Sequence, residues 1–287
     1  MQKGKIILNR EWLICFRRQL KYDNINGILH HWKMVIPVIV LTTFICGKFL
    51  SVYYCQAQEF LSLPVPSTGD FIVDMFKGME KYEPHIKTKP FEIPAFYLFF
   101  NLYISYVIAR YPLNDLRGMG MNVLVNSRNR SSWIVSKFVW CAEMVLLLYA
   151  VTFAIAITFS ALSGQVSMHL NTEINISVSN LQLTQDQFFL NVILLPIITS
   201  ICISYVQLTI SFRVSLLAGS IVTIVLICLS AYYSNTFLVG NYLMLLRNSA
   251  VIGSGGVLAS HGCILSILLS IVSLLLSNAW FAKRNIF

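Results

Sequence analysis

The sequence predicts an all-α integral membrane protein with six transmembrane helices and both chain ends in the cytoplasm. Three observations support this fold class: the composition, the spacing of the apolar runs, and the placement of Lys and Arg. Hydrophobic residues make up 56% of the 287 residues and charged residues only 11%, with a mean hydropathy of +0.69. Soluble domains carry about a quarter charged residues, so this chain has too few charges to cover a water-facing surface. The predicted spans are residues 34–54, 93–109, 138–162, 188–212, 214–233 and 260–280, and the external loops are residues 55–92, 163–187 and 234–259.

Residues 1–33 precede the first span and predict an amphipathic helix on the cytoplasmic face of the membrane. Apolar side chains that include Trp12, Phe16 and Leu20 share one side of this helix, and cationic side chains that include Arg17 and Arg18 share the other. A basic amphipathic helix that carries a Trp lies in the plane of the lipid headgroups. We therefore expect an interfacial helix before the first span.

Two charges fall inside the predicted spans. Lys48 lies about 21 Å along the first span, because a helix rises 1.5 Å per residue. We expect its long side chain to extend along the helix so that the ammonium reaches the outer surface of the membrane. Glu143 lies near the cytoplasmic end of the third span, where we expect an Arg or Lys of the preceding loop to reach it. A buried pair between Lys48 and Glu143 is the alternative.

The second span is aromatic and unusually polar. Tyr97, Asn101 and Ser105 recur every four residues and so share one face. A polar stripe in lipid must turn toward other helices or toward a cavity. It therefore predicts either hydrogen bonds between helices or a lining of a substrate path.

The last three spans carry faces of small and polar residues, which predict close packing between helices. These faces comprise Pro196, Ser200, Ser204, Gln207 and Ser211 in the fourth span, Ser215, Gly219 and Thr223 in the fifth, and Ser266, Ser270, Ser273 and Ser277 in the sixth.

Two of the external loops contain structure of their own. In loop 55–92, apolar residues at helical spacing from Ile72 to Tyr82 predict a short helix that lies on the membrane or caps a cavity. Loop 234–259 is weakly apolar and glycine-rich, and it predicts a broken helix pair whose free backbone groups meet protein or water.

The loop at residues 110–137 sets the orientation of the chain. It carries five Lys or Arg against one acid, Asp115, and short cationic loops stay in the cytoplasm. Leu116 to Val125 predicts a short apolar helix interrupted by Gly118 and Gly120. Such a helix is either a docking surface for a soluble partner or part of a solvated loop that only reports the topology.

The distribution of Lys and Arg over the whole chain agrees with this orientation. Fifteen of the 21 fall in segments predicted to be cytoplasmic, five fall in the external loops, and Lys48 lies within the first span.

Several functional classes are excluded by missing motifs. The sequence contains no HExxH, GxSxG or GxxxxGK[ST] pattern, and no Cys/His spacing typical of a metal site. We therefore expect no enzyme activity, no bound metal or other cofactor, and no nucleic-acid partner. The seven cysteines mostly fall in apolar runs and are expected to be reduced.

The chain resembles the membrane-spanning permease subunits of bacterial type-2 ABC exporters over nearly its full length. The resemblance is carried by the basic amphipathic helix before the first span, by the basic loop that ends Trp133-Ile-Val-Ser-Lys137, and by the stretch Asn241-Tyr-Leu-Met-Leu-Leu-Arg247 before the last span. The last two are similar to segments of small Firmicutes permeases.

This resemblance implies a cytoplasmic coupling helix between the second and third spans, at about residues 115–126, that docks on an ATP-binding subunit. The implied coupling residues are Asp115, Leu116, Arg117, Met119, Met121 and Leu124. The implied translocation path follows the second and fifth spans through Tyr97, Asn101, Ser105, Ser215, Gly219 and Thr223. ATP and Mg²⁺ would bind the partner subunit, a second permease chain would complete the path, and the complex would lie in the cell inner or plasma membrane. The expected substrate is a peptide, an antimicrobial compound or another amphipathic molecule.

Two other classes remain open. A secondary transporter would need an inverted repeat and charges at the centre of the membrane, and neither is visible in the sequence. A membrane-embedded sensor or immunity protein would bind a toxic peptide without ATP coupling. An ATPase that purifies with the chain would separate these classes from the exporter.

Overall fold

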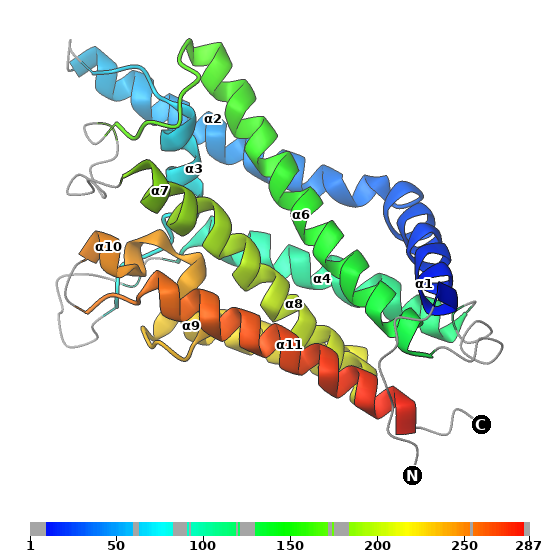
Figure 1. Ribbon diagram of the computed structural model, residues 1–287. Helices are drawn as coiled ribbons and strands as arrows, with labels where there is room; N and C mark the ends of the chain where they lie inside the picture. The colour runs from blue at the N-terminus through cyan, green and yellow to red at the C-terminus, as the bar shows by residue number, and fades with distance from the viewer. Residues whose placement is uncertain are drawn as a thin grey trace.

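The computed structural model shows an all-helical protein built around a bundle of long helices (Figure 1). It describes residues 10–59, 63–82, 91, 93–118, 120, 130–171, 174, 184–252 and 255–283. The α-helices are α1 (Arg10–Asp23), α2 (Ile36–Glu59), α3 (Thr68–Phe76), α4 (Ala95–Arg117), α6 (Arg130–Ser163), α7 (Gln185–Phe188), α8 (Leu195–Arg213), α9 (Leu216–Tyr232), α10 (Ser249–Ile252) and α11 (Ala259–Lys283). Shorter π- or 3₁₀-helical segments are η1 (Asn24–Leu29), η2 (Trp32–Val35), η4 (Phe189–Leu194), η5 (Val239–Leu243) and η6 (Leu245–Arg247).

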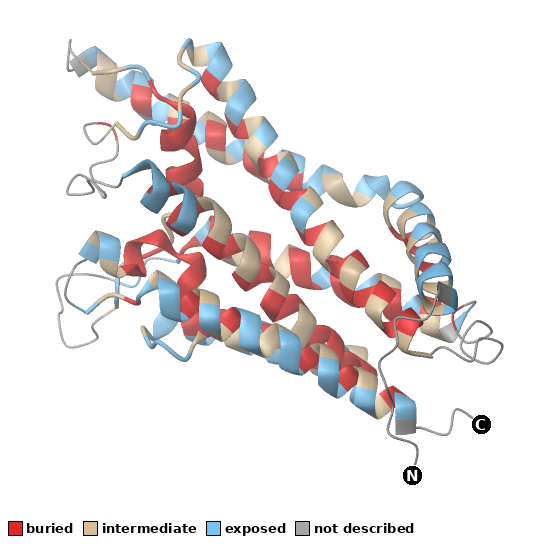
Figure 2. Ribbon diagram, viewed as in Figure 1, coloured by how far each residue is buried: buried red, intermediate tan, exposed pale blue. Residues whose placement is uncertain are grey.

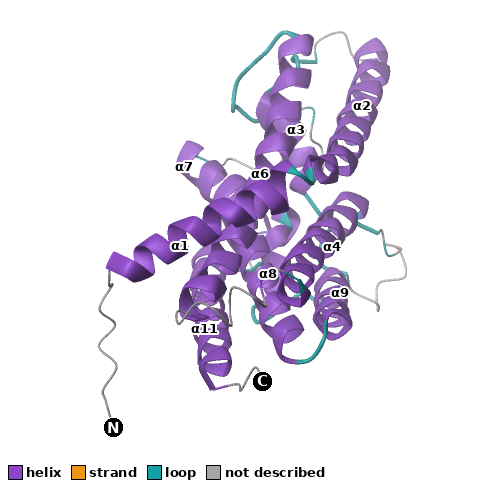
Figure 3. Cartoon of the chain, turned by 90° about the vertical axis from the view of Figure 1, so that its right-hand side faces the viewer, coloured by secondary structure: helices purple, strands orange, loops and turns teal. Residues whose placement is uncertain are grey.

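The long helices run alternately in opposite directions, so the bundle has two ends (Figure 1). We call the end that holds α1, the last turns of α4, α8 and α11, and the start of α6 the α1 end. The opposite end, which holds α3, α7, α10 and the η5–η6 segment, is the α3 end. Figure 3 views the molecule from the side where α1 lies and shows this helix crossing the bundle next to α6.

Four described helical segments are long and apolar enough to cross a membrane: Trp32–Gln58, Arg130–Ser163, Gln185–Arg213 and Ala259–Ala282. The chain is therefore a multi-pass membrane protein. The helix α9 is apolar but only 17 residues long. The helix α4 has 23 residues and carries the polar stripe. That α4 and α9 also cross the membrane, and that the α1 end faces the cytoplasm, remain predictions.

Many polar side chains are buried in the bundle and many large apolar side chains are exposed. Figure 2 shows the buried residues on the inward faces of the long helices and the exposed residues on their outward faces. Phe44 is 68% exposed on α2, Leu217 is 70% exposed on α9 and Leu275 is 60% exposed on α11. The helix α8 lies between α4, α6, α9 and α11, and its polar face is buried. Water-soluble proteins show the opposite distribution, with polar side chains on the surface. An apolar exterior is expected of a protein surrounded by lipid.

The faces of small residues form the predicted packing seams. Ser277 Oγ donates to Thr209 Oγ1 at 3.0 Å, and Thr209 Oγ1 donates to the carbonyl of Ser273 at 3.1 Å, which joins α11 to α8. A Cβ atom at Gly219 would lie 2.0 Å from Ser211 Oγ, so α9 can approach α8 this closely only because it carries a glycine there.

The helix α3 corrects the prediction for loop 55–92. It begins at Thr68 and ends at Phe76, earlier than the predicted helix, because Ser67 and Asp70 form a capping box at its start. It is also buried rather than lying on the surface, since it packs against α2, α4 and α6. Asp70 accepts hydrogen bonds from the backbone and side-chain nitrogens of Asn171 at 2.9 and 3.0 Å, which joins two connecting segments at the α3 end.

Before α11, the chain forms the short turns η5 and η6 instead of one helix, as expected for a broken helix pair. Arg247 in η6 is fully buried. It donates to the carbonyls of Ser230 and Ala231 at 2.6 Å and of Tyr233 at 2.9 Å, and to Asn241 Oδ1 at 2.6 Å. Its Nε donates to the carbonyl of Met79 at 3.4 Å. Arg247 therefore caps the C-terminal end of α9, and we call this group the arginine cluster.

Burial lowers the pKa of Arg247 to about 10, which leaves its guanidinium charged at physiological pH.

Candidate functional site

The candidate site lies at the α1 end and is built around Lys137. The sequence predicted residues 130–137 to be part of a loop, and this is wrong: α6 begins at Arg130. The extra helical turns form because their apolar face packs at the end of the bundle, where the Trp133 ring lies 5.8 Å from Phe281 and 5.9 Å from Phe212. Lys137 lies on this buried face and is fully buried. A buried ammonium requires opposite charge close by.

The first opposite charge comes from Asp23, at the last residue of α1. Its Oδ1 lies 2.5 Å from Lys137 Nζ. It also accepts hydrogen bonds from Gln19 and Tyr111, each at 3.1 Å, and from the hydroxyl of Ser136. Four donors thus surround one carboxylate, which offsets the cost of removing it from water.

The second opposite charge comes from Asp115, in the last turn of α4. Its Oδ2 lies 2.6 Å from Lys137 Nζ and forms an ion pair without a well-aligned hydrogen bond. The ammonium also lies 4.9 Å from the centroid of the Tyr111 ring and 5.1 Å from that of Trp133, within range of cation–π attraction. We call Asp23, Asp115 and Lys137 the ion cluster; its formal charge is −1.

Close packing beside the ion cluster fixes its geometry. Gly27 in η1 is buried, and a Cβ atom there would lie 2.4 Å from Trp140 Nε1 and 3.0 Å from the Tyr111 ring. The rings of Tyr111 and Trp140 are 4.6 Å apart. The segment after α1 therefore lies directly on α4 and α6, which keeps Asp23 within reach of Lys137.

The ion cluster joins three segments that are far apart in the sequence. Asp115 lies in the last turn of α4 and Lys137 near the start of α6, and both belong to the predicted cytoplasmic loop, residues 110–137. Asp23 ties α1 to both helices. A displacement of that loop would therefore be transmitted to α1, and through η1 and η2 to α2.

The predicted coupling residues are only partly within the structure. Asp115 and Leu116 belong to the last turn of α4, and Arg117 ends that helix, so these three do not start a separate helix. Met119, Met121 and Leu124 lie outside the described residues. The docking role of the loop stays a prediction.

The predicted path residues bond helices to one another. Tyr97 donates to the carbonyl of Ile227 at 3.2 Å, Asn101 accepts from Ser200 at 3.2 Å, and Gln207 donates to the carbonyl of Ser105 at 2.9 Å. Gly219 and Thr223 are buried on α9, and Ser215 caps its N-terminus. These contacts are hydrogen bonds between helices, which is one of the two interpretations of the polar stripe on α4. A role of the stripe in transport stays a prediction.

The two charges within the spans behave differently. Lys48 is exposed, as expected for a side chain that extends to the surface. Glu143 is half-buried, and its Oε2 has no hydrogen-bond partner among the described residues. Lys137, the loop cation closest to Glu143 in sequence, pairs with the ion cluster instead.

Sequence reasoning did not identify Asp23 as a site residue, although a signal for it exists. Eleven residues separate Trp12 from Asp23, which places both on nearly the same side of α1. An acid on the apolar side of an amphipathic helix indicates a buried partner.

The described residues contain no group of three or more His, Cys, Asp or Glu that could hold a metal ion, and the seven cysteines are free. Comparisons with models of protein families, with curated proteins and with solved structures found no match.

Proposed function

We propose that the chain is the membrane-spanning permease subunit of an ATP-binding-cassette exporter for a peptide, an antimicrobial compound or another amphipathic substrate. A separate subunit would bind ATP and Mg²⁺, so this chain would not be an enzyme by itself. The observation that supports the proposal best is the ion cluster, because it ties the two helices that flank the predicted coupling loop to α1.

In this proposal the α1 end faces the cytoplasm. Closure of the ATPase subunits on ATP pushes on the loop at residues 110–137 and on α1, and the ion cluster couples the two and so moves α2. The bundle then exchanges an inward-open for an outward-open state, together with a second permease chain. The substrate's different affinities for the two states set the direction of transport.

Co-purification tests the proposal. The full chain, tagged and expressed in its own host, is expected to retain an ATPase through purification in mild detergent. Replacing Leu116, Met119 and Met121 together by Asp should release the ATPase, because an apolar docking surface does not accept buried carboxylates. The matched control is Val214→Asp in the turn between α8 and α9, at the same end of the bundle, where Val214 is 73% exposed.

If no ATPase is retained by the unmodified chain, the exporter proposal is wrong. If the ATPase stays bound to the triple variant and to the control alike, the coupling loop is not the docking surface.

A second candidate function, a proton-coupled secondary transporter, is favoured by one observation. Glu143 carries a buried carboxylate oxygen without a described partner inside a membrane-spanning helix, where a carboxyl group that binds and releases a proton would lie. In that case Glu143→Gln would abolish transport driven by a pH gradient, and no ATPase would be needed.

A further inference from the structure

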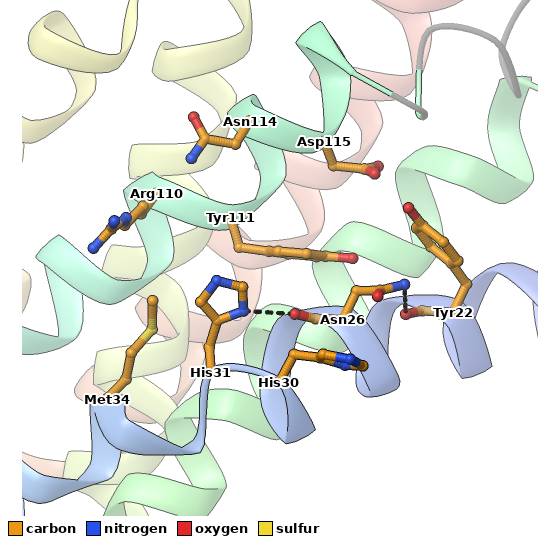
Figure 4. Close-up of a pocket in the computed structure, with 9 residues that line it drawn as sticks. All are labelled: Tyr22, Asn26, His30, His31, Met34, Arg110, Tyr111, Asn114 and Asp115. Atoms are coloured by element: carbon orange, nitrogen blue, oxygen red, sulfur yellow. Dashed lines mark hydrogen bonds between the residues drawn. The ribbon is translucent and has the colours of Figure 1, made fainter.

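A cavity lies at the α1 end, beside the ion cluster. Its volume is about 380 Å³. It lies between the segment after α1 and the last turns of α4, and it opens at the surface (Figure 4). It is lined by Tyr22, Asn26, His30, His31, Met34, Arg110, Tyr111, Asn114 and Asp115.

The cavity has opposite charges at its two sides. Arg110 is exposed on α4 at one side, where its guanidinium donates to the hydroxyl of Tyr106 at 3.2 Å. Asp115 is buried at the other side, with Tyr111 between them (Figure 4). Arg110 and Asp115 lie five positions apart on α4, which corresponds to a rise of about 7.5 Å and a turn of about 140°, so their side chains leave the helix in different directions. The two carboxylates of the ion cluster share one ammonium, so the Asp115 side carries an excess of negative charge.

Two histidines of the segment between α1 and α2 also line the cavity. His31 Nδ1 lies 2.7 Å from the carbonyl of Asn26, and His30 Nδ1 lies 3.0 Å from the carbonyl of Ile25. A carbonyl only accepts, so Nδ1 carries the hydrogen in each ring and Nε2 remains available. In this tautomer Nε2 is an acceptor.

The neutral lining near Asp115 consists of hydrogen-bonding groups. Asn114 lies beside it on α4. Burial, followed by the charges of Asp115 and Asp23, raises the pKa of Tyr22, so its phenol keeps its proton at physiological pH. This side of the cavity can therefore surround a small cation with oxygen acceptors.

The cavity lies where the chain enters its first long apolar segment, Trp32–Gln58. Apolar side chains next to it are exposed: Leu29 is 65% exposed, Trp32 60% and Ile36 42%. A Trp followed by Lys33 marks the level of the lipid headgroups. A molecule with a charged head and apolar tails could therefore place its head in the cavity and its tails along these residues.

We propose that this cavity binds the headgroup of a phospholipid that carries a primary ammonium as well as its phosphate. The phosphate lies against Arg110, the ammonium lies against Asp115, and the acyl chains follow Trp32 and Ile36. The proposal does not depend on an ATPase partner.

The test measures lipid binding to the purified full chain by native mass spectrometry in mild detergent. Phosphatidylethanolamine, phosphatidylglycerol and phosphatidylcholine with identical acyl chains are added at equal concentration. Phosphatidylethanolamine is expected to bind about tenfold more tightly than either of the others, because a single charge-assisted hydrogen bond is worth about that factor. Phosphatidylglycerol lacks the ammonium, and phosphatidylcholine has no N–H to donate.

Two variants locate the binding site. Arg110→Gln removes the phosphate contact and is expected to weaken binding of phosphatidylethanolamine about tenfold. The matched control, Arg213→Gln, removes an exposed arginine at the same end that does not line the cavity, and it should leave binding unchanged. Both residues are exposed, so neither change is expected to unfold the chain, and thermal unfolding confirms this.

Three outcomes would overturn the proposal. Equal losses in the two arginine variants would place binding elsewhere. A preference for phosphatidylglycerol would remove the role of Asp115. Displacement of the lipid by soluble phosphoethanolamine at equal concentration would mean that the site takes a free phosphoamine rather than a membrane lipid.

Discussion

Lys137 at the α1 end and Arg247 at the α3 end are both fully buried, yet the protein compensates their charges in different ways. Lys137 faces two carboxylates that come from α1 and α4. Arg247 has only neutral partners in its described hydrogen bonds, and most of these are carbonyls that α9 leaves free at its end. Lysine is a compact point charge, whereas the guanidinium is a rigid fork of five donors, and each suits its surroundings.

The two buried cations hold different kinds of groups together. The carbonyls around Arg247 belong to a helix end and a neighbouring turn, so the arginine cluster holds one local arrangement of the backbone. The ion cluster instead joins segments that are separated by up to 114 residues, through side chains alone. Side-chain ion pairs can rearrange without unfolding a helix. The arrangement at the α3 end therefore depends on backbone groups, whereas the ion cluster at the α1 end depends on side chains.

The largest expected effect comes from Arg247→Met. The change leaves up to five acceptors without a donor, and we expect it to lower the free energy of unfolding by about 4 kcal/mol or more. Thermal unfolding in detergent, followed by size-exclusion chromatography, measures the loss. Arg213→Met, at an exposed arginine, is the control and should stay within about 0.5 kcal/mol of the unmodified chain. A small loss for Arg247→Met would mean that water replaces the guanidinium and that the arrangement at this end does not depend on it.

Lys137→Met is expected to cost about 3–5 kcal/mol, because it leaves two buried carboxylates without their cation. Asp23→Asn should cost less, since Lys137 keeps Asp115. In the double variant the loss should be smaller than the sum of the single losses by about 0.5–3 kcal/mol. Urea unfolding of the four proteins in the cycle gives these values. Additive losses would show that the two residues do not stabilise each other and would remove the distinction between the two ends.

Gly27→Ala tests the packing beside the ion cluster. The new methyl group meets Trp140 and Tyr111, and we expect a loss of about 1–3 kcal/mol from overpacking. Gly47→Ala in α2 is the matched control, because nothing lies within 4 Å of its added Cβ; helix propensity predicts a gain of up to about 1 kcal/mol there. Thermal unfolding of both variants decides the point. Equal behaviour of the two would show that η1 does not lie closely on α6.

Ser200→Ala is expected to have the smallest effect, about 0.6 kcal/mol, although Ser200 bonds both Asn101 and Tyr149. A hydrogen bond between helices is worth little in a membrane, since the separated helices find other partners. The same urea series measures this loss. A loss of unfolding free energy above about 2 kcal/mol would show that polar contacts at the centre of the bundle stabilise the fold as strongly as the clusters at its two ends.

The sequence allowed most of the helices to be predicted, because each long apolar run is a local signal. Residues 260–280 fall inside α11, residues 34–54 cover the end of η2 and most of α2, and the fifth span matches α9 closely. The start of α6 was missed, since the packing of Trp133 on Phe281 extends the helix past the apolar run.

The candidate site could be predicted only in part. Asp115 and Lys137 stood out as charges in a loop between apolar runs, but their partner Asp23 lies on a different segment. No local pattern shows which of several basic residues a distant acid will meet. The burial of Arg247 was equally hidden, because its partners are backbone carbonyls, which every residue carries.

One ammonium between two acids has a further consequence. Asp23 and Asp115 approach Lys137 from different helices, so either acid can withdraw while the other still neutralises the lysine. Half of the contact can thus open without leaving an unpaired cation in a dry interior. With a single acid, the same opening would leave the ammonium without any carboxylate.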